Sequence, residues 1–267
     1  MSGPGGTVRL SAVVVAQDEE AMLPGCLASL AFCDEILVID GGSTDRTRAL
    51  AQAGRARVLD RPYDDSASQH EFGRQEAQGS WILTLDADER CSPELAKAAR
   101  AIADGSPDRG GPVAWSIPFK NHFRGVWLRH GGLWPDRHVR LFRRDRCRYD
   151  PERTVHERLL LHGAVGKLSE TVHHHTWGSL SHCLRKTERY GERVAQGLHA
   201  RGETAGAWDV VARPLWRFVR SYVLRLGFLD GPAGAVIAAA RAWEAYARYA
   251  RLWELGRFPE AAKDPLR

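Results

Sequence analysis

Asp86 and Asp88 are separated by one residue, and their carboxylates could together hold a divalent cation. They follow the apolar run 81–85, which has the length and composition of a buried strand. In a strictly extended strand, side chains two residues apart point to the same face. Oxygen ligands suit Mg²⁺ or Mn²⁺, and such a cation can also hold a diphosphate. The alternative is a solvated acidic turn, because short motifs often match by chance.

Two upstream segments repeat this pattern of a buried strand with a polar tip. The apolar run 36–39 ends in Asp40, and the glycines after it, Gly41 and Gly42, permit a tight turn with positive φ. The run 10–16 ends at Gln17, where acidic residues follow. In a parallel α/β sheet, ligands bind at the carboxyl ends of the strands. We therefore expect the three polar tips to meet at one edge of a sheet.

The elements that position these tips alternate between strands and helices, which predicts right-handed parallel βαβ units and an α/β fold. Helical spacing of apolar residues predicts helices over 20–30, 47–53 and 93–102 in this part of the chain. The Gly-, Pro- and Asp-rich segment 104–112 marks a boundary. We predict an α/β domain over 8–180, with halves 8–104 and 113–180, and a helical region over 181–257, with helices at 180–202, 215–226 and 235–255.

Three motifs carry a resemblance to a known family. They are AQDEE at 16–20, DGGSTD at 40–45 and DADER at 86–90. In this order they resemble the inverting nucleotide-sugar glycosyltransferases of family 2, which implies a GT-A fold, a mainly parallel sheet flanked by helices. Later segments, including LRK at 184–186 and LGFLDG at 226–231, resemble the subgroup with lipopolysaccharide-core β-1,4-glucosyltransferases.

The resemblance also implies roles for individual residues. Glu19 and Asp40 would meet the ribose and the base. The full set expected around the nucleotide sugar is Gln17, Glu19, Asp40, Gly42, Gln69 and Asp86. His70 and Glu71 depart from the basic residue and asparagine that commonly follow this glutamine in the family. Asp88, Asp86 and His174 would hold Mn²⁺ or Mg²⁺ on the donor diphosphate.

An inverting transfer needs a base for the acceptor hydroxyl, and a carboxylate is the usual choice. By resemblance Glu157 is that base, and Asp136 is the second candidate. Either carboxylate could instead serve only a structural role, in a salt bridge to a nearby arginine.

Three consecutive histidines, 173–175, cannot all point the same way in a strand. They could also be a polar strand end without a ligand, or His173 and His175 could bind zinc.

Aromatic residues suggest where the acceptor lies. Phe123, Trp127 and Trp134 are candidates for stacking on a sugar, although buried packing would explain them equally. Aromatic residues alternate with arginines over 215–226, a pattern typical of a helix lying on an anionic membrane. Alternatively, the C-terminal helices close the catalytic domain or form a dimer contact.

Composition narrows the class of protein. The 267 residues carry a net charge of +5, which favours an anionic partner. Acidic strand ends would repel nucleic acid, whereas a nucleotide diphosphate held through a metal fits them. The five cysteines are odd in number and form no Cys-x-x-Cys pair, which favours a reducing cytoplasm. We see no signal peptide and no apolar run that could span a bilayer.

These observations predict a metal-dependent inverting transferase that moves a hexose, with glucose favoured by the subgroup, from a UDP-sugar to a cell-envelope glycolipid such as lipopolysaccharide core. It would act in the cytoplasm at the inner face of the membrane. The rival enzyme is a protein or peptide glycosyltransferase. The rival from another class is a non-catalytic module that binds nucleotides or nucleic acid, and a membrane scaffold would not need three acidic strand ends.

Overall fold

The computed structural model describes residues 8–105, 111–150 and 158–258. Within them the chain forms two compact units. The first contains the described residues up to Phe119 and those of Asp136–His174, and the second contains Lys120–Pro135 and the described residues from His175 onward. We predicted a division at residue 181; the observed division lies near residue 175, and it also assigns Lys120–Pro135 to the second unit.

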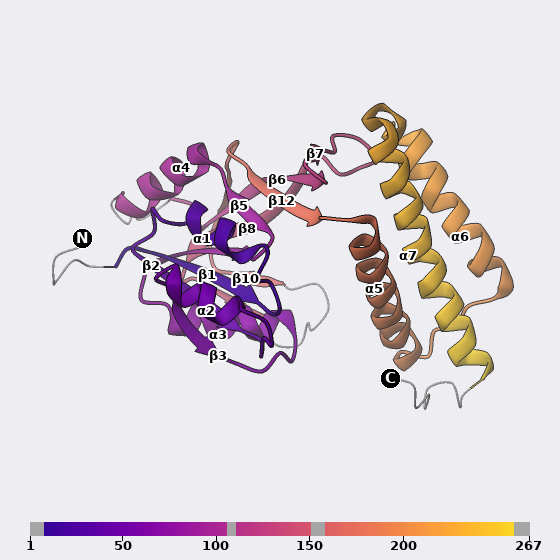
Figure 1. The fold of residues 1–267 in the computed structure, drawn as a ribbon, viewed down its shortest axis with the longest axis horizontal. Helices are drawn as coiled ribbons and strands as arrows, with labels where there is room; N and C mark the ends of the chain where they lie inside the picture. Colours follow the sequence, from indigo (N-terminus) through magenta and orange to yellow (C-terminus); the bar gives the residue numbers. More distant parts are fainter. Residues whose placement is uncertain (1–7, 106–110, 151–157, 259–267) are drawn as a thin grey trace. The chain divides into compact units, whose positions relative to one another are not determined.

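The first unit is built on a mixed sheet, in which four neighbouring strands are parallel (Figure 1). In spatial order these are β3 (Arg57–Asp60), β2 (Glu35–Asp40), β1 (Leu10–Ala16) and β4 (Trp81–Asp86). The order continues through β8 (Asp136–Arg143), β6 (Ala114–Phe123), β12 (Val172–Trp177) and β5 (Glu89–Cys91). Strand β8 is antiparallel to both β4 and β6. The predicted α/β fold class is confirmed.

Four short strands complete the β-structure. Two pair with β6: β7 (Val126–Trp127) runs antiparallel to it and β11 (Val165–Lys167) runs parallel. The other two, β9 (Cys147–Tyr149) and β10 (Leu159–Leu161), form a separate antiparallel pair.

Helices cover both faces of the parallel strands, because successive side chains of a strand point to opposite faces. Ala12 and Val14 of β1 pack in one core with α1 (Leu23–Ser29), α2 (Thr47–Ala53) and α4 (Pro93–Asp104). Val13 packs in a second core with α3 (Ser66–Glu76). The Oγ atom of Ser92 accepts a hydrogen bond from the Leu95 N–H at 3.1 Å, so α4 begins where the sequence predicted.

The second unit is mainly helical. It contains α5 (Leu180–Ala200), α6 (Ala207–Val219), a π-helical turn η1 (Arg220–Leu224), a 3₁₀ turn η2 (Gly227–Asp230) and α7 (Gly231–Arg257). Helix α7 packs against both α5 and α6, as Figure 1 shows. Leu128, Leu133, Cys183 and Ile237 belong to its buried core.

The predicted start of the helix after Pro214 is wrong. Helix α6 begins at Ala207 and contains Pro214 in its interior. An interior proline removes one helical hydrogen bond and costs about 3 kcal/mol, and packing of α6 along α7 offsets this cost. Within the described residues, no single helix is long and apolar enough to cross a membrane. Residues Ala207–Leu224 and Gly227–Arg257 are long and apolar enough only when they are taken together, and the two segments are bent by 71° relative to each other.

Candidate functional site

The polar strand tips lie side by side because of the register of the parallel strands. Ala16 at the end of β1 pairs with Asp40 at the end of β2, and Val15 pairs with Asp86 at the end of β4. Since β1 lies between β2 and β4, the loops that leave these strands emerge at one carboxyl edge. This is the edge where the sequence predicts ligand binding.

Hydrogen bonds hold the loops after β1 and β2 together. The Asp40 side chain, only 3% exposed, accepts a hydrogen bond from the Ser43 hydroxyl at 2.5 Å. Asp18, with a φ of 53°, accepts one from the Thr44 N–H at 2.7 Å. Gly42 has a φ of 94°, which a residue with a Cβ rarely adopts. The predicted turn after Asp40 is therefore present, and Asp40 also stabilises it; contact of Asp40 with a nucleotide stays a prediction.

The other residues expected at the nucleotide lie around the same segments. The Gln17 side chain donates a hydrogen bond to the Gly41 carbonyl at 3.3 Å. Glu19 is partly buried in the loop after β1. Gln69 on α3 is fully buried, and its Nε2 donates to the backbone carbonyls of residues 61 and 62 at 2.9 and 3.0 Å. Its Oε1 is buried and meets no hydrogen-bond donor among the described residues.

Asp86 and Asp88 do not lie in one extended strand. Strand β4 ends at Asp86, and Ala87 and Asp88 form a turn before β5 begins. The two carboxylates consequently have different partners. Asp86 Oδ2 lies 3.1 Å from Arg140 Nη2, and its Oδ1 lies 3.6 Å from His70 Nε2. Desolvation alone would raise the pKa of Asp86, but Arg140 and His70 hold this pKa well below its ordinary value.

Asp88, Glu89 and His174 form a group that could hold a metal ion. One ligand atom from each residue lies within 4.8 Å of the others, and Asp88 Oδ2 is 3.5 Å from His174 Nε2. His174 reaches this position because β12 runs antiparallel to β5 and pairs His174 with Glu89. Carboxylate and imidazole are ligands that suit Mn²⁺, and carboxylate suits Mg²⁺, so the donor set fits the predicted cation.

Glu89 was not singled out from the sequence. Its side chain is 1% exposed, and burial raises its pKa well above the ordinary value. Glu89 Oε2 accepts the Asp86 N–H at 2.9 Å, and its Oε1 lies 3.0 Å from Arg140 Nη2. Since both oxygens are engaged, Glu89 fixes the turn, whereas Asp88 and His174 are placed to reach a cation. A cation at Asp86 would have to compete with Arg140.

His174 and His175 have different partners, which agrees with the expectation that the three histidines do not all point the same way. His174 lies beside Asp88, whereas the His175 ring stacks on His122 at a centroid distance of 5.2 Å. Within the described part of the chain, the possible metal group includes His174 but neither His173 nor His175.

A basic pocket of about 490 Å³ adjoins the acidic turn through Arg140, which lines it. Its other charged walls include Arg137 and Arg158. Tyr149 also lines the pocket and stacks on His70 at a centroid distance of 5.3 Å. Guanidinium groups bind phosphate and carboxylate oxygens well, so this pocket can accept an anionic group next to the possible metal site.

The two candidate bases differ in what the structure says of them. Asp136 begins β8, is 41% exposed and has its Oδ1 3.0 Å from His138 Nε2. His138 lines the basic pocket. Glu157 lies outside the described residues, so its role as base stays a prediction from the resemblance.

The aromatic candidates for the acceptor belong to the second unit. The Trp127 and Trp134 rings meet edge to face at 5.3 Å, and the Arg129 guanidinium lies 4.2 Å from the centroid of Trp127. Lys120 Nζ also lies over Trp127, at 4.8 Å. Phe123 packs against the buried core of this unit. The cations over Trp127 compete with a sugar for its ring, and stacking on Trp134 remains a prediction.

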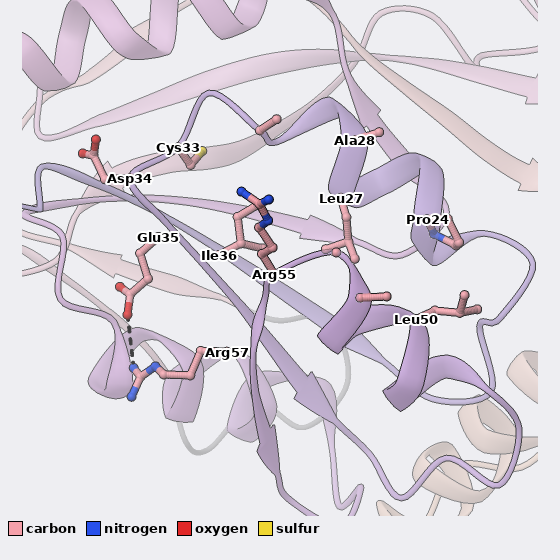
Figure 2. Close-up of a pocket in the computed structure, with 13 residues that line it drawn as sticks. Pro24, Leu27, Ala28, Cys33, Asp34, Glu35, Ile36, Leu50, Arg55 and Arg57 are labelled. Carbon is pink, nitrogen blue, oxygen red and sulfur yellow. Dashed lines mark ion pairs between the residues drawn. The ribbon is translucent and has the colours of Figure 1, made fainter. Parts of the chain in front are cut away.

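A further pocket, of about 840 Å³, lies away from this edge (Figure 2). Its walls come from α1, α2 and the beginning of β2, and they include Leu27, Leu50 and Ile36. Glu35 and Arg57 form an ion pair at 3.3 Å on its rim. The pocket therefore lies at the amino ends of β2 and β3, whereas the carboxylates lie at the other ends of the strands.

Comparison with known proteins gives a family match and several relatives. The sequence profile described as "Glycosyl transferase family 2" matches residues 11–149, from the second residue of β1 to the end of β9. A lipopolysaccharide core biosynthesis glycosyltransferase, LpsC from Rhizobium meliloti (strain 1021), is 29% identical over 261 residues, covering 90% of this chain and 93% of that protein.

Two further similarities each cover about half of the chain. An undecaprenyl-phosphate 4-deoxy-4-formamido-L-arabinose transferase from Pseudomonas paraeruginosa is 32% identical over 147 residues, covering 49% of this chain and 40% of that protein. A structure of glucosyl-3-phosphoglycerate synthase from Mycobacterium tuberculosis, in complex with Mn²⁺, UDP and glucosyl-3-phosphoglycerate, is 22% identical with a TM-score of 0.33. The similarity covers 47% of this chain and 51% of the synthase chain.

Proposed function

Because the chain belongs to glycosyl transferase family 2, we propose that it transfers a hexose from a UDP-sugar to a glycolipid of the cell envelope, with inversion at the anomeric carbon. The observation that carries this proposal is the convergence of Asp88, Glu89 and His174 at the carboxyl edge of the parallel strands. The likeness to a lipopolysaccharide core enzyme over nearly the whole chain supports lipopolysaccharide core as the acceptor. Glucose is the sugar that the subgroup resemblance favours.

Asp88 and His174 would hold Mn²⁺ or Mg²⁺, which would offset the negative charge that develops on the leaving UDP. Glu89 positions the turn by accepting the Asp86 N–H. Arg140 lies between the acidic turn and the basic pocket, where it can contact a donor phosphate. The polar groups at the tips of β1 and β2, with Gln69, would surround the nucleoside.

In the transfer itself, the acceptor hydroxyl attacks the anomeric carbon while the bond from that carbon to the UDP oxygen breaks. A carboxylate takes the hydroxyl proton, and the electron pair of the broken bond leaves with UDP. We assign this base to Glu157, with Asp136 as the alternative. The products are an inverted glycoside and UDP.

The test is a donor screen with the purified chain. UDP-glucose, UDP-galactose and UDP-N-acetylglucosamine would be supplied with Mn²⁺, with Mg²⁺ or with EDTA, and UDP release would be measured. We expect Asp88→Asn to lower metal-stimulated turnover by at least about a hundredfold, since loss of even a supporting group can cost 10–100-fold in metal affinity or activity. Asp60→Asn is the matched control, because Asp60 ends β3, is exposed and pairs with Arg48.

Several results would argue against the proposal. Unchanged turnover in Asp88→Asn would refute the role of Asp88 in holding the metal. If no donor is turned over under any condition, the assignment of the chain as a glycosyltransferase is refuted. Extraction of labelled product into an organic phase separates the glycolipid acceptor from the rival, a protein or peptide acceptor, whose product stays in the aqueous or protein fraction.

A further inference from the structure

Helix α6 and the turns after it present a run of exposed apolar side chains. Trp208 is 79% exposed, Leu215 is 63% exposed and Trp216 is 57% exposed. Trp208, Val211 and Leu215 are spaced three and four residues apart, which places them on one side of the helix. The run continues beyond α6 with Val223, Leu224, Leu226, Phe228 and Leu229. We refer to residues 208–229 as the α6 surface.

The α6 surface is also strongly basic. Residues 208–229 contain four arginines and one acidic residue, Asp209. Arg213 pairs with Asp209 one turn earlier. Among the described residues, Arg217, Arg220 and Arg225 form no ion pair with a carboxylate that would neutralise them. Elsewhere in this unit, arginines on α7 pair with glutamates of the same helix at 244 and 254.

Three of these arginines gather around a small hollow. Arg217, Arg220 and Arg225 line it together with Arg241, Ser221 and Gly131. Arg241 Nη1 donates a hydrogen bond to the Gly131 carbonyl at 2.8 Å. The hollow has a volume of about 20 Å³, which is enough for one oxygen-sized group. Guanidinium groups that converge on such a space fit an oxygen of a phosphate.

We propose that the α6 surface docks on a bilayer that contains anionic phospholipids. Its tryptophans and aliphatic side chains would enter the boundary between headgroups and acyl chains, and its arginines would bind headgroup phosphates. The inference does not depend on the proposed transferase reaction.

Two observations favour a membrane over other partners. Nucleic acid would match the arginines but would leave the exposed leucine, valine and phenylalanine side chains in water. A second copy of this surface would bring like charges together, because its four arginines outnumber its single carboxylate, Asp209, which already pairs with Arg213.

The experiment measures co-sedimentation of the full chain with vesicles of phosphatidylcholine, with or without phosphatidylglycerol. We expect binding only when phosphatidylglycerol is present. The variant Arg217→Gln/Arg220→Gln/Arg225→Gln should bind about a hundredfold more weakly, since each basic residue at such a surface contributes about fivefold. The matched control removes three exposed arginines of α5, by Arg185→Gln/Arg189→Gln/Arg193→Gln, and should lose less than about fivefold.

A second variant tests the apolar part of the surface. Trp208→Ser/Leu215→Ser/Trp216→Ser should reduce vesicle binding at least about tenfold, because it removes three large exposed apolar groups. Its control is Trp243→Ser/Trp253→Ser on α7, which should bind as the unaltered chain does. Unchanged thermal unfolding would show that each variant is folded, and unchanged UDP release from a soluble donor would show that the first unit is intact.

Three results would overturn the proposal. Equal losses in the two arginine variants would mean that binding follows net charge and not this surface. Equal binding to vesicles without phosphatidylglycerol would remove the role of the arginines. A dimer that forms without vesicles, and that the tryptophan and leucine substitutions on α6 dissociate, would make this face a contact between copies.

Discussion

Substitution of Glu71 by glutamine would test how α3 is held in place beside the candidate site. Glu71 Oε2 accepts hydrogen bonds from the Tyr149 N–H at 2.9 Å and from Arg74 Nε at 2.8 Å, and its Oε1 accepts one from Arg74 Nη2 at 2.6 Å. Tyr149 stacks on His70, which faces Asp86. The Glu71 carboxylate therefore supports the groups that lie against the acidic turn.

The expected loss of stability follows from these contacts. Glutamine has one acceptor oxygen, which can keep the Tyr149 N–H, but its NH₂ group then faces the donors of Arg74. A hydrogen bond to a charged group contributes about 1.5–3 kcal/mol. Arg74 keeps a second acceptor, the Arg144 carbonyl at 2.9 Å, which limits the penalty. We expect Glu71→Gln to lower the free energy of unfolding by about 2 kcal/mol at pH 7.

The pH dependence has a definite sign. Desolvation would raise the pKa of Glu71, but hydrogen bonds from Arg74 and Tyr149 lower this pKa below its ordinary value of 4.5. A carboxyl whose pKa is lower in the folded state adds stability above the unfolded pKa and loses it as the pH falls through the folded pKa. The difference between the unaltered chain and Glu71→Gln should therefore shrink once the pH falls below about 4.5.

The assay is urea unfolding followed by tryptophan fluorescence at pH 7 and at acidic pH. Glu76→Gln, at the end of the same helix, is the matched control, because Glu76 is 42% exposed and lies 3.7 Å from Arg57. Its loss should stay below about 0.5 kcal/mol, as is typical of exposed ion pairs. Equal midpoints for Glu71→Gln and the unaltered chain at pH 7 would refute the reasoning. So would a difference that does not shrink in acid.

Two further predictions concern packing and catalysis. A Cβ at Gly73 would collide with Val13 Cγ1, so Gly73→Ala should lower the free energy of unfolding by about 1–2 kcal/mol. Gly197→Ala, whose Cβ would meet nothing within 4 Å, should raise this free energy slightly. Both are measured by urea unfolding, and the reverse order would contradict the packing of α3 on β1. If Glu157 is the base, Glu157→Gln should lower kcat by about 10²–10⁴-fold with little change in the KM of the donor, as measured by UDP release. A larger loss of kcat in Asp136→Asn would assign the base to Asp136 instead.

Much of the first unit follows from short-range rules. The runs 10–16 and 81–85 are strands because buried parallel strands are continuously apolar, and they occupy β1 and β4 as predicted. Ser92 and Pro93 begin α4 because a serine cap and a first-turn proline both favour a helix start. The helix predicted over 47–53 matches α2 at both ends.

Other features depend on contacts between segments far apart in the sequence. The sequence predicted no helix between 53 and 93, whereas the structure has α3 at Ser66–Glu76. Its buried face consists of Ala67, Gln69, His70 and Gly73, which give no apolar period. Glu89 reads as one acid among several, and only the pairing of β5 with β12 turns it inward. The helix was predicted to start after Pro214 because proline is disfavoured inside a helix, whereas α6 begins at Ala207.

The central position of β1 has a consequence for variation in this protein. Inserting or deleting one residue in β1 would move Ala16 by about 3.3 Å relative to Asp40 on one side and reverse the facing of its side chains toward both helical layers. Libraries that aim to alter donor choice should therefore keep the lengths of β1, β2 and β4, retain Asp88 and Glu89, and substitute exposed positions in the loops that follow β1 and β2.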